Sequence, residues 1–519
     1  MAWAVAEEAG GRSGERLEVR SDLSTLARGG ILNLIGAGCT GLFNFLLWVV
    51  VARKLRIHEL GMFHQAVGLF TILTAVSQLG AQAGLVRTIS RFRALGRIQD
   101  VRRILAVALI PVLAVGAALG LVAYLFAPQL SNIFARGADG VAPYLRVLGP
   151  LLPLAAIYMV AVSATQGFGT MIPAVVVEKI GKPAAQLGLI LVAVGMGSAA
   201  MALAWGAPIL LGLGVIAVWL RRLLHRFERR HLTDLEPASP KGPMGRLARE
   251  FWRFTAPRSL ASIFQQTILQ LDPLLIGALA SPSLAGIYGT ATKYLLVPHL
   301  AIAAILQVMQ PKIAELLARE SHERAQTVYQ TATWWLIAGV WPIYLTLVVF
   351  APFLLRIFTP EIVAGHSAVT ILALAMLLAV ACGPVDAVLL MGGKSSLSLI
   401  NWGMALAINL VGDLLLIPKM GINGAAVAWA ASILVRNVVP MLQVAVLLKL
   451  HPFGKGFGRV AVASIVCYGL LGMAARMIGG LSLPVFLFSG ATSTAIYAVL
   501  VWRWRRLLNL GVLRDVFKR

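Results

Sequence analysis

The chain has 519 residues, of which 59% are hydrophobic and only 13% are charged, and its formal net charge is +24. Soluble globular proteins carry roughly 25% charged residues, so this composition excludes a soluble protein whose whole surface faces water. It is typical of a polytopic membrane protein, in which the outer surface is itself apolar.

Continuous apolar stretches of about 20 residues are long enough to cross a bilayer. In chain order we predict fourteen spans, at 29–52, 62–84, 104–127, 143–168, 171–195, 198–220, 255–280, 284–309, 330–352, 363–391, 395–418, 421–448, 460–478 and 482–502. These stretches do not alternate polar and apolar residues as barrel strands do. We therefore predict an all-α membrane protein with about 14 transmembrane helices, and a count of 12 remains the alternative.

The spans divide the chain into five regions: a cytoplasmic N-terminal tail (1–28), an N-lobe of six spans (29–220), a cytoplasmic linker (221–254), a C-lobe of six spans (255–450), and two further spans with a cytoplasmic tail (451–519). The first region contains acidic residues and no apolar core, so we do not interpret it as a signal peptide. The linker contains a Pro/Ser-rich stretch, which is typical of a connection between lobes.

Lysine and arginine are distributed unequally between the two sides of the membrane. Of the 45 such residues, we place six in loops on the side opposite the N-terminus: Arg53, Lys54, Arg56, Arg136, Arg356 and Lys419. Cytoplasmic loops carry the basic excess, so we predict a multi-pass protein of the inner (plasma) membrane with both termini in the cytoplasm. Residues 87–103 and 221–230 resemble nucleic-acid patches, but loops that face an anionic leaflet explain them, and we expect no nucleic-acid partner.

The sequence contains an internal repeat. FAPQLSNIF (126–134) returns as FAPFLLRIF (350–358), 224 positions later, and shorter matches recur in the same order at offsets of 225 and 226. A repeat of six spans enters the membrane from the same side each time. We therefore predict two parallel six-helix lobes related by a pseudo-two-fold axis along the membrane normal, followed by two extra helices.

Two stretches carry a resemblance to a known family: LARGGILNLIGAGCTGLFNFLLWVVVARKL and its continuation (26–92), and LLIPKMGINGAAVAWAAS (415–432). They resemble Wzx-type polysaccharide flippases of the MOP exporter superfamily, which also contains the MATE drug exporters and the MurJ flippases. The resemblance implies two lobes in a V around a central cavity. It also implies that the substrate is an undecaprenyl-pyrophosphate-linked oligosaccharide, moved to the periplasmic face by alternating access, with glycosyltransferases or a polymerase of the same pathway as partners.

Ionisable residues inside spans are costly and mark functional candidates. Lys182 lies near the midplane of its span, Pro183 after it can kink the helix, and Arg436 lies at a similar depth in another lobe. Several such cations round one cavity would suit a pyrophosphate, and pairing within a lobe is the alternative. The candidates for the substrate cavity are Lys179, Lys182, Lys293, Arg436 and Arg146.

Two acidic residues inside spans are candidates for an ion pair or for ion coupling, namely Asp272 and Asp386. The sodium-coupled MATE exporters carry acids in the same spans, but these two differ in depth by roughly 15 Å at 1.5 Å per residue, so we do not expect one shared site. Asp272 and Lys293 lie at equal depth on one hairpin, and we predict an ion pair between them. We predict no metal, no disulfide and no cofactor, and we interpret GAGCTG (36–41) as a helix-packing motif.

Two other functions compete with the flippase interpretation. A drug or small-molecule antiporter on the same fold would need an aromatic or acidic cavity, whereas the charges predicted at mid-membrane are mostly basic. A polytopic glycosyltransferase, polymerase or ligase would need a sizeable periplasmic loop with acids, whereas the predicted loops there are short. We therefore predict a transport protein rather than an enzyme.

Overall fold

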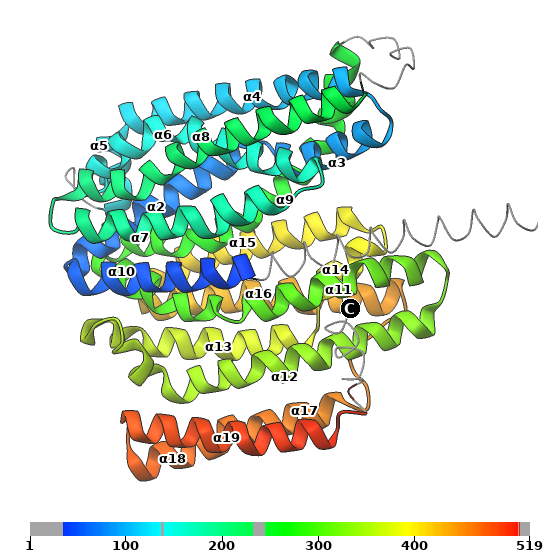
Figure 1. The fold of residues 1–519 in the computed structure, drawn as a ribbon. Coiled ribbons are helices and arrows are strands. Elements are labelled where there is room, and N and C mark those ends of the chain that lie inside the picture. The colour runs from blue at the N-terminus through cyan, green and yellow to red at the C-terminus, as the bar shows by residue number, and fades with distance from the viewer. Residues whose placement is uncertain (1–34, 136–139, 232–243, 507, 509–519) are drawn as a thin grey trace, which may run out of the picture.

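The computed structural model of the protein describes residues 35–135, 140–231, 244–506 and 508. These residues form a bundle of helices without a strand (Figure 1). Eleven of the helices are long and apolar enough to cross a membrane. The predicted class, an all-α polytopic membrane protein, is confirmed.

The first half of the chain supplies the upper part of the bundle in Figure 1. Its elements are the helix Ile35–Lys54, α2 (Ile57–Ser77), α3 (Ala81–Ala94), α4 (Ile98–Leu125), α5 (Ala127–Ala135), α6 (Ala142–Gly167), the π-helix η1 (Ala174–Gly181), α7 (Lys182–Ala193) and α8 (Ser198–His231).

The second half begins with a 36-residue helix, α9 (Met244–Leu279). Its further elements are α10 (Pro282–Ala291), the 3₁₀-helix η2 (Thr292–Leu296), α11 (His299–Ala318), α12 (His322–Leu355), η3 (Pro360–Gly365), α13 (His366–Ala381), α14 (Val385–Met391), α15 (Ser395–Met420) and α16 (Ile422–Leu447). The last hairpin lies along α12 at the bottom of Figure 1 and consists of α17 (Phe457–Ser464), η4 (Ile465–Leu470), α18 (Leu471–Gly479) and α19 (Leu483–Arg503).

The repeat in the sequence is matched by a repeat in the helices. The pairs α4 and α12, α6 and α13, and α8 and α16 each begin 224 residues apart. The first residue of the repeated phrase has similar non-helical backbone angles in both copies. Phe126 has φ −95° and ψ 18°, and Phe350 has φ −111° and ψ 15°. Equal spacing and an equal local break support the predicted duplication, while the residue boundaries of the lobes stay a prediction.

Three of the fourteen predicted spans are not among the eleven spanning helices. The span 171–195 is divided into η1 and α7, and the span 284–309 is divided into α10, η2 and α11. Proline lacks a backbone N–H and disturbs the helix before it, and Pro183 and Pro298 stand beside these breaks. The third, 255–280, lies within α9 and is interrupted by several glutamines and charged residues. The count of 14 therefore stays a prediction.

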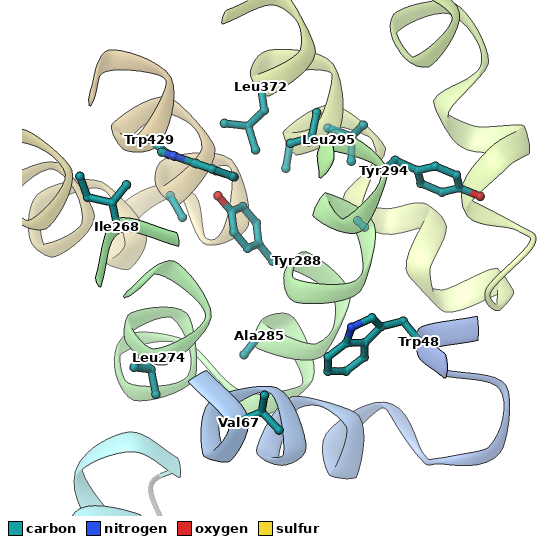
Figure 2. Packing of buried hydrophobic residues seen from close by; sticks show 14 of the residues in the cluster. Trp48, Val67, Ile268, Leu274, Ala285, Tyr288, Tyr294, Leu295, Leu372 and Trp429 are labelled. Carbon is teal, nitrogen blue, oxygen red and sulfur yellow. The ribbon is translucent and has the colours of Figure 1, made fainter. Parts of the chain in front are cut away.

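The two halves meet where α2 packs on α10. A Cβ atom at Gly61 would lie 1.7 Å from the carbonyl oxygen of Pro282, and one at Gly286 would lie 2.7 Å from that of Ile57. Residues 61 and 286 are equivalent at the offset of 225, so the contact lies on the predicted pseudo-two-fold axis. Figure 2 shows Trp48 and residues of α2 facing α10 in the hydrophobic core that joins the halves.

Helix α9 contacts both halves of the molecule, because it packs against α2, α3, α10 and α15. Its early turns lie close to α3: a Cβ atom at Gly84 would lie 2.3 Å from Thr255 Oγ1, and one at Gly80 would lie 2.7 Å from Ser259 Cβ. We call the end of the bundle at which α3 ends, α4 begins and α8 ends the basic end, since Arg91 and other arginines gather there. It lies on the right of Figure 1.

Candidate functional site

A polar cavity of about 440 Å³ lies in the first half and is bounded on one side by α9. Its walls come from the helix Ile35–Lys54, α2, α3, α6, η1, α7, α8 and α9. The residues of α9 in this wall are Ser262, Gln265 and Gln266. Both halves of the chain therefore contribute to the cavity.

Amide and hydroxyl side chains make up most of the polar wall of this cavity. Amides and hydroxyls both donate and accept hydrogen bonds, and pockets that combine them with aromatic faces bind small molecules in a fixed orientation. The amide and hydroxyl members are Thr40, Asn44, Thr71, Thr74, Gln78, Gln82, Gln186, Ser262, Gln265 and Gln266, and the aromatic members are Phe70, Tyr158 and Trp205.

Among the described residues of the cavity wall, the charged side chains are one acid and one base, and they pair with each other. Lys182 Nζ lies 3.0 Å from Glu178 Oε1, and each side chain is 22% exposed. Lys182 Nζ also lies 5.8 Å from the centroid of the Tyr158 ring. Glu178 Oε2 and the Tyr158 hydroxyl are buried beside each other. The described part of the wall is thus neutral and offers polar atoms to a ligand.

The π-helix η1 places Glu178 and Lys182 at the cavity. It spans Ala174–Gly181, and α7 begins at Lys182, immediately before Pro183. Single-turn π segments occur frequently at functional sites. Thr40 Oγ1 donates a hydrogen bond of 2.6 Å to the carbonyl oxygen of Lys179, which ties the distorted turn to the first helix. The structure shows π-helical turns directly before Pro183, while the predicted kink there stays a prediction.

Lys179 itself lies against the first helix. A Cβ atom at Gly36 would lie 3.1 Å from Lys179 Cδ and 2.8 Å from Val175 Cγ1. Gly36 opens the motif 36–41, which we interpreted as a packing motif, and this glycine does allow a close approach of the two helices. Lys179 is not among the residues that line the cavity.

A break between α2 and α3 exposes further polar groups to the cavity, and the sequence analysis missed it. Leu79 has φ +50° and Gly80 has φ +69°, and Gln78 and Gln82 on either side of them line the cavity. Discontinuous helices near the midplane are a feature of transporter binding sites. The signal in the sequence was the pair of glutamines round a glycine inside an apolar stretch (SQLGAQAG, 77–84).

Three of the predicted cavity cations lie elsewhere. The Arg436 guanidinium lies over the Trp402 ring in the second half, 4.5 Å from its centroid. Lys293 Nζ lies 4.5 Å from the centroid of the Trp48 ring, and Arg146 is exposed on α6. Lys182 is the one predicted cation that lines the polar cavity, so the structure does not bring the five together.

The predicted ion pair between Asp272 and Lys293 is wrong. Asp272 accepts hydrogen bonds from the Tyr288 hydroxyl and, at 3.0 Å, from Asn409 Nδ2. Lys293 instead stacks on Trp48, beside His64, whose ring lies parallel to the indole at 4.0 Å. Equal depth placed the two charges at one level of the membrane, but they point to different neighbours.

A buried acidic cluster lies in the second half, formed by Asp272, Asp413, Asn409 and Tyr288. The two aspartates are 2% and 0% exposed, and Asn409 Nδ2 donates a hydrogen bond of 3.0 Å to each. Two ionised carboxylates cannot share one desolvated site, so the cluster has to hold a proton or a bound cation. Asp386 belongs to another group, in which it accepts a hydrogen bond of 2.6 Å from Ser398 Oγ.

The sequence analysis identified Asp272 but missed Asp413 and Asn409. Residues 409 and 413 are four apart on α15, so their side chains lie on one face of the helix. An amide and an acid spaced four residues apart inside an apolar span were the signal in the sequence that could have identified these two residues. Among the described residues, no group of three or more His, Cys, Asp or Glu side chains forms a metal site.

The sequence profile of the family "Polysaccharide biosynthesis protein" matches residues 26–317, which is more than half of the chain. The chain belongs to this family. No curated protein sequence matches the chain significantly. The predicted family is confirmed, and with it a membrane protein of polysaccharide biosynthesis.

Solved structures of transporters share the fold of this polysaccharide biosynthesis protein. The lipid II flippase MurJ, in an inward closed conformation, matches 92% of this chain and 100% of its own with a TM-score of 0.72 at 12% identity. An inward-facing MATE multidrug resistance transporter of the MOP superfamily matches 79% of this chain and 94% of its own, with a TM-score of 0.64 at 16% identity. A MOP superfamily transporter from Pyrococcus furiosus matches 82% and 95%, with a TM-score of 0.55 at 17% identity. At these identities the likeness shows the fold alone.

Proposed function

We propose that the protein is a flippase that moves a lipid-linked oligosaccharide from the cytoplasmic to the periplasmic leaflet of the inner membrane by alternating access. The substrate is the undecaprenyl-pyrophosphate-linked form that the family resemblance implies. Cytoplasmic loops carry an excess of Lys and Arg. The basic end therefore faces the cytoplasm in this proposal, together with both termini.

The polar cavity is the observation that carries this proposal. Its wall of amides, hydroxyls and aromatic rings matches the hydroxyl groups and apolar faces of sugar rings. A sugar cannot cross hydrocarbon unaided because its hydroxyl groups would lose their hydrogen bonds. A cavity with these groups replaces water during the passage, while the polyprenyl chain stays in the lipid.

The buried acidic cluster supplies a site for ion coupling. A cluster that must hold a proton or a cation responds to a gradient of that ion. Its position on α9 and α15, where α9 also borders the polar cavity, connects ion occupancy to the arrangement of the two halves. We propose that loading and unloading of Asp272 and Asp413 bias the protein between its two access states.

The second candidate function is a drug antiporter of the MATE type, which the shared fold supports. A cavity for organic cations would need unpaired acids, whereas Glu178 in the cavity is paired with Lys182 at 3.0 Å. The neutral, amide-rich wall favours the glycan.

The test is transport in proteoliposomes with two substrates, a fluorescent lipid-linked oligosaccharide and a cationic dye. We expect wild type to expose the glycan to a membrane-impermeant reagent and to leave the dye unmoved. Gln265→Ala with Gln266→Ala removes two amides of the wall and should slow glycan transport, while Gln310→Ala on α11, outside the cavity, should not. Dye transport without glycan transport would establish the antiporter instead.

A further inference from the structure

A hollow of about 100 Å³ lies at the basic end between α3 and the first turns of α9, and a second of about 460 Å³ adjoins it on α9 alone. Both include Glu250 and Phe254, so they form one continuous depression, and α3 and the start of α9 lie together on the right of Figure 1. We call this feature the arginine groove, after the arginines that line it: Arg87, Arg91, Arg246, Arg249 and Arg253.

The groove has a fixed floor and an excess of positive charge. Phe92 and Phe251 are each 3% exposed and form part of its lining. The Arg87 guanidinium lies 3.9 Å from the centroid of the Phe254 ring, which holds it in place. Arg91 Nη1 lies 2.6 Å from Glu250 Oε1, the one acid in the lining.

The remaining three arginines of the groove have no acidic partner among the described residues. Arg246, Arg249 and Arg253 form no ion pair with a described residue, and all three are exposed on α9. Residues 246, 249 and 253 are three and four apart, so they share one face of the helix. Guanidinium groups bind phosphate oxygens in a bidentate manner, so the groove is suited to a ligand with several phosphate oxygens.

The groove and the polar cavity lie along the same two helices. On α3, Gln82 lines the cavity and Arg87 lines the groove, five residues or about 7.5 Å apart. On α9, Ser262 lines the cavity and Phe254 lines the groove, eight residues or about 12 Å apart. A molecule with a phosphorylated end and a chain of a few sugars is long enough to contact both.

We propose that the arginine groove binds the pyrophosphate of the lipid-linked substrate on the cytoplasmic side, while its sugars point along α3 and α9 toward the polar cavity. The proposal rests on the flippase function. It assigns to the groove the pyrophosphate contact that the sequence analysis expected from the candidate cavity cations. The described residues of the cavity wall are neutral together, so charge recognition and sugar recognition are separate steps at separate places.

A second basic hollow provides the matched control. Arg222 and Arg226 line a hollow of about 540 Å³ on α8 at the same end of the molecule, with Trp219. That hollow lies on α8 and includes no residue of α3 or α9. Attraction to an anionic leaflet acts on both arginine sets alike, whereas pyrophosphate recognition by the groove depends on one of them.

The binding test uses the purified full chain in nanodiscs of phosphatidylcholine and farnesyl pyrophosphate as the probe. Arg249→Gln with Arg253→Gln should weaken binding about tenfold or more, and Arg222→Gln with Arg226→Gln should leave it unchanged. Phosphatidylglycerol added to the nanodiscs should not displace the probe. The proposal would be overturned if all three proteins bound the probe equally, or if both variants lost the same affinity. Displacement of the probe by phosphatidylglycerol would also overturn it, because the groove would then be a phospholipid site.

A transport assay separates this proposal from the proposed function. In proteoliposomes, the variant of Arg249 and Arg253 should raise the apparent KM for lipid-linked oligosaccharide about tenfold and leave the maximal rate within about twofold. If wild type moves no glycan while farnesyl pyrophosphate binding still depends on the groove, the flippase function fails and the groove stands as a prenyl diphosphate site. If wild type transports and the variant has an unchanged KM, the groove proposal fails and the flippase function stands.

Discussion

The two halves of the molecule share a helical plan and carry opposite chemistry. The acidic cluster of the second half consists of Asp272, Tyr288, Asn409 and Asp413. At the offset of 225, the first half has Leu47, Phe63, Ala184 and Gly188 in these places. Conversely, Glu178 and Lys182 of the cavity correspond to Gly403 and Ala407.

Each half therefore lacks the charged groups of the other. A duplicated scaffold places equivalent backbones at equivalent depths, but the side chains on it have diverged. We infer that the first half was specialised for holding the substrate and the second for holding an ion. The halves contact each other through α2, α10 and α9.

The strongest test of this division removes the ion site from the second half. Asp413→Asn keeps the shape of the side chain but leaves one carboxyl group where two had to share a proton or cation. We expect gradient-driven glycan transport to fall by on the order of a hundredfold, which corresponds to about 2.7 kcal/mol. The measurement is transport in proteoliposomes with an imposed proton or sodium gradient.

The matched control for that variant is Asp386→Asn, since Asp386 is hydrogen-bonded to Ser398 outside the cluster. It should keep the dependence on the gradient. If the Asp413 variant kept gradient-driven transport and the Asp386 variant lost it, the ion-coupling site would lie at Asp386 and not at the acidic cluster.

The contact between the halves is the next target. Gly61→Ala puts a methyl group 1.7 Å from the Pro282 carbonyl oxygen, so α2 and α10 have to separate. We expect the free energy of unfolding to fall by about 1–3 kcal/mol, seen as a lower midpoint in thermal denaturation. Gly214→Ala on α8, where an added Cβ meets no atom within 4 Å, should not be destabilised. Equal melting of both variants would contradict the close contact.

The charge pair of the first half is the third target. Glu178→Gln and Lys182→Met each leave one charge at the cavity wall without its partner, and the double variant removes both. A double-mutant cycle on thermal stability should give a coupling energy of about 0.5–1 kcal/mol, because the pair is partly exposed. Additive losses would show that the two side chains do not interact in the folded protein.

The last target is the stacked arginine of the second half, with an effect as small as that of the charge pair. Arg436→Lys keeps the charge but loses the planar contact with Trp402, whose centroid lies 4.5 Å away. We expect a loss of about 0.5–1 kcal/mol in thermal stability. Arg146→Lys, on the exposed face of α6, serves as the reference and should be silent. A silent Arg436→Lys would mean that the stacking contributes nothing measurable.

Most of the fold could be predicted from the sequence because its signals are local. Predicted spans such as 143–168, 395–418 and 421–448 agree with α6 (Ala142–Gly167), α15 (Ser395–Met420) and α16 (Ile422–Leu447) within two residues. Less of the site could be predicted. Of the five candidate cations, Lys182 lines the polar cavity, and the glutamines that dominate the wall were not identified.

The sequence by itself determined that the chain crosses a membrane as helices, roughly where eleven of the spans lie, and that one half repeats the other. Apolar length and recurring phrases carry this information without reference to the rest of the chain. Only the tertiary structure decided which charges meet. Depth follows from the count of residues, but successive residues of a helix turn by about 100°, so the direction of a side chain depends on how the helices are rotated against each other. For this reason Asp272 meets Asn409 of α15, near Asp413, whereas Lys293 at the same depth lies on Trp48.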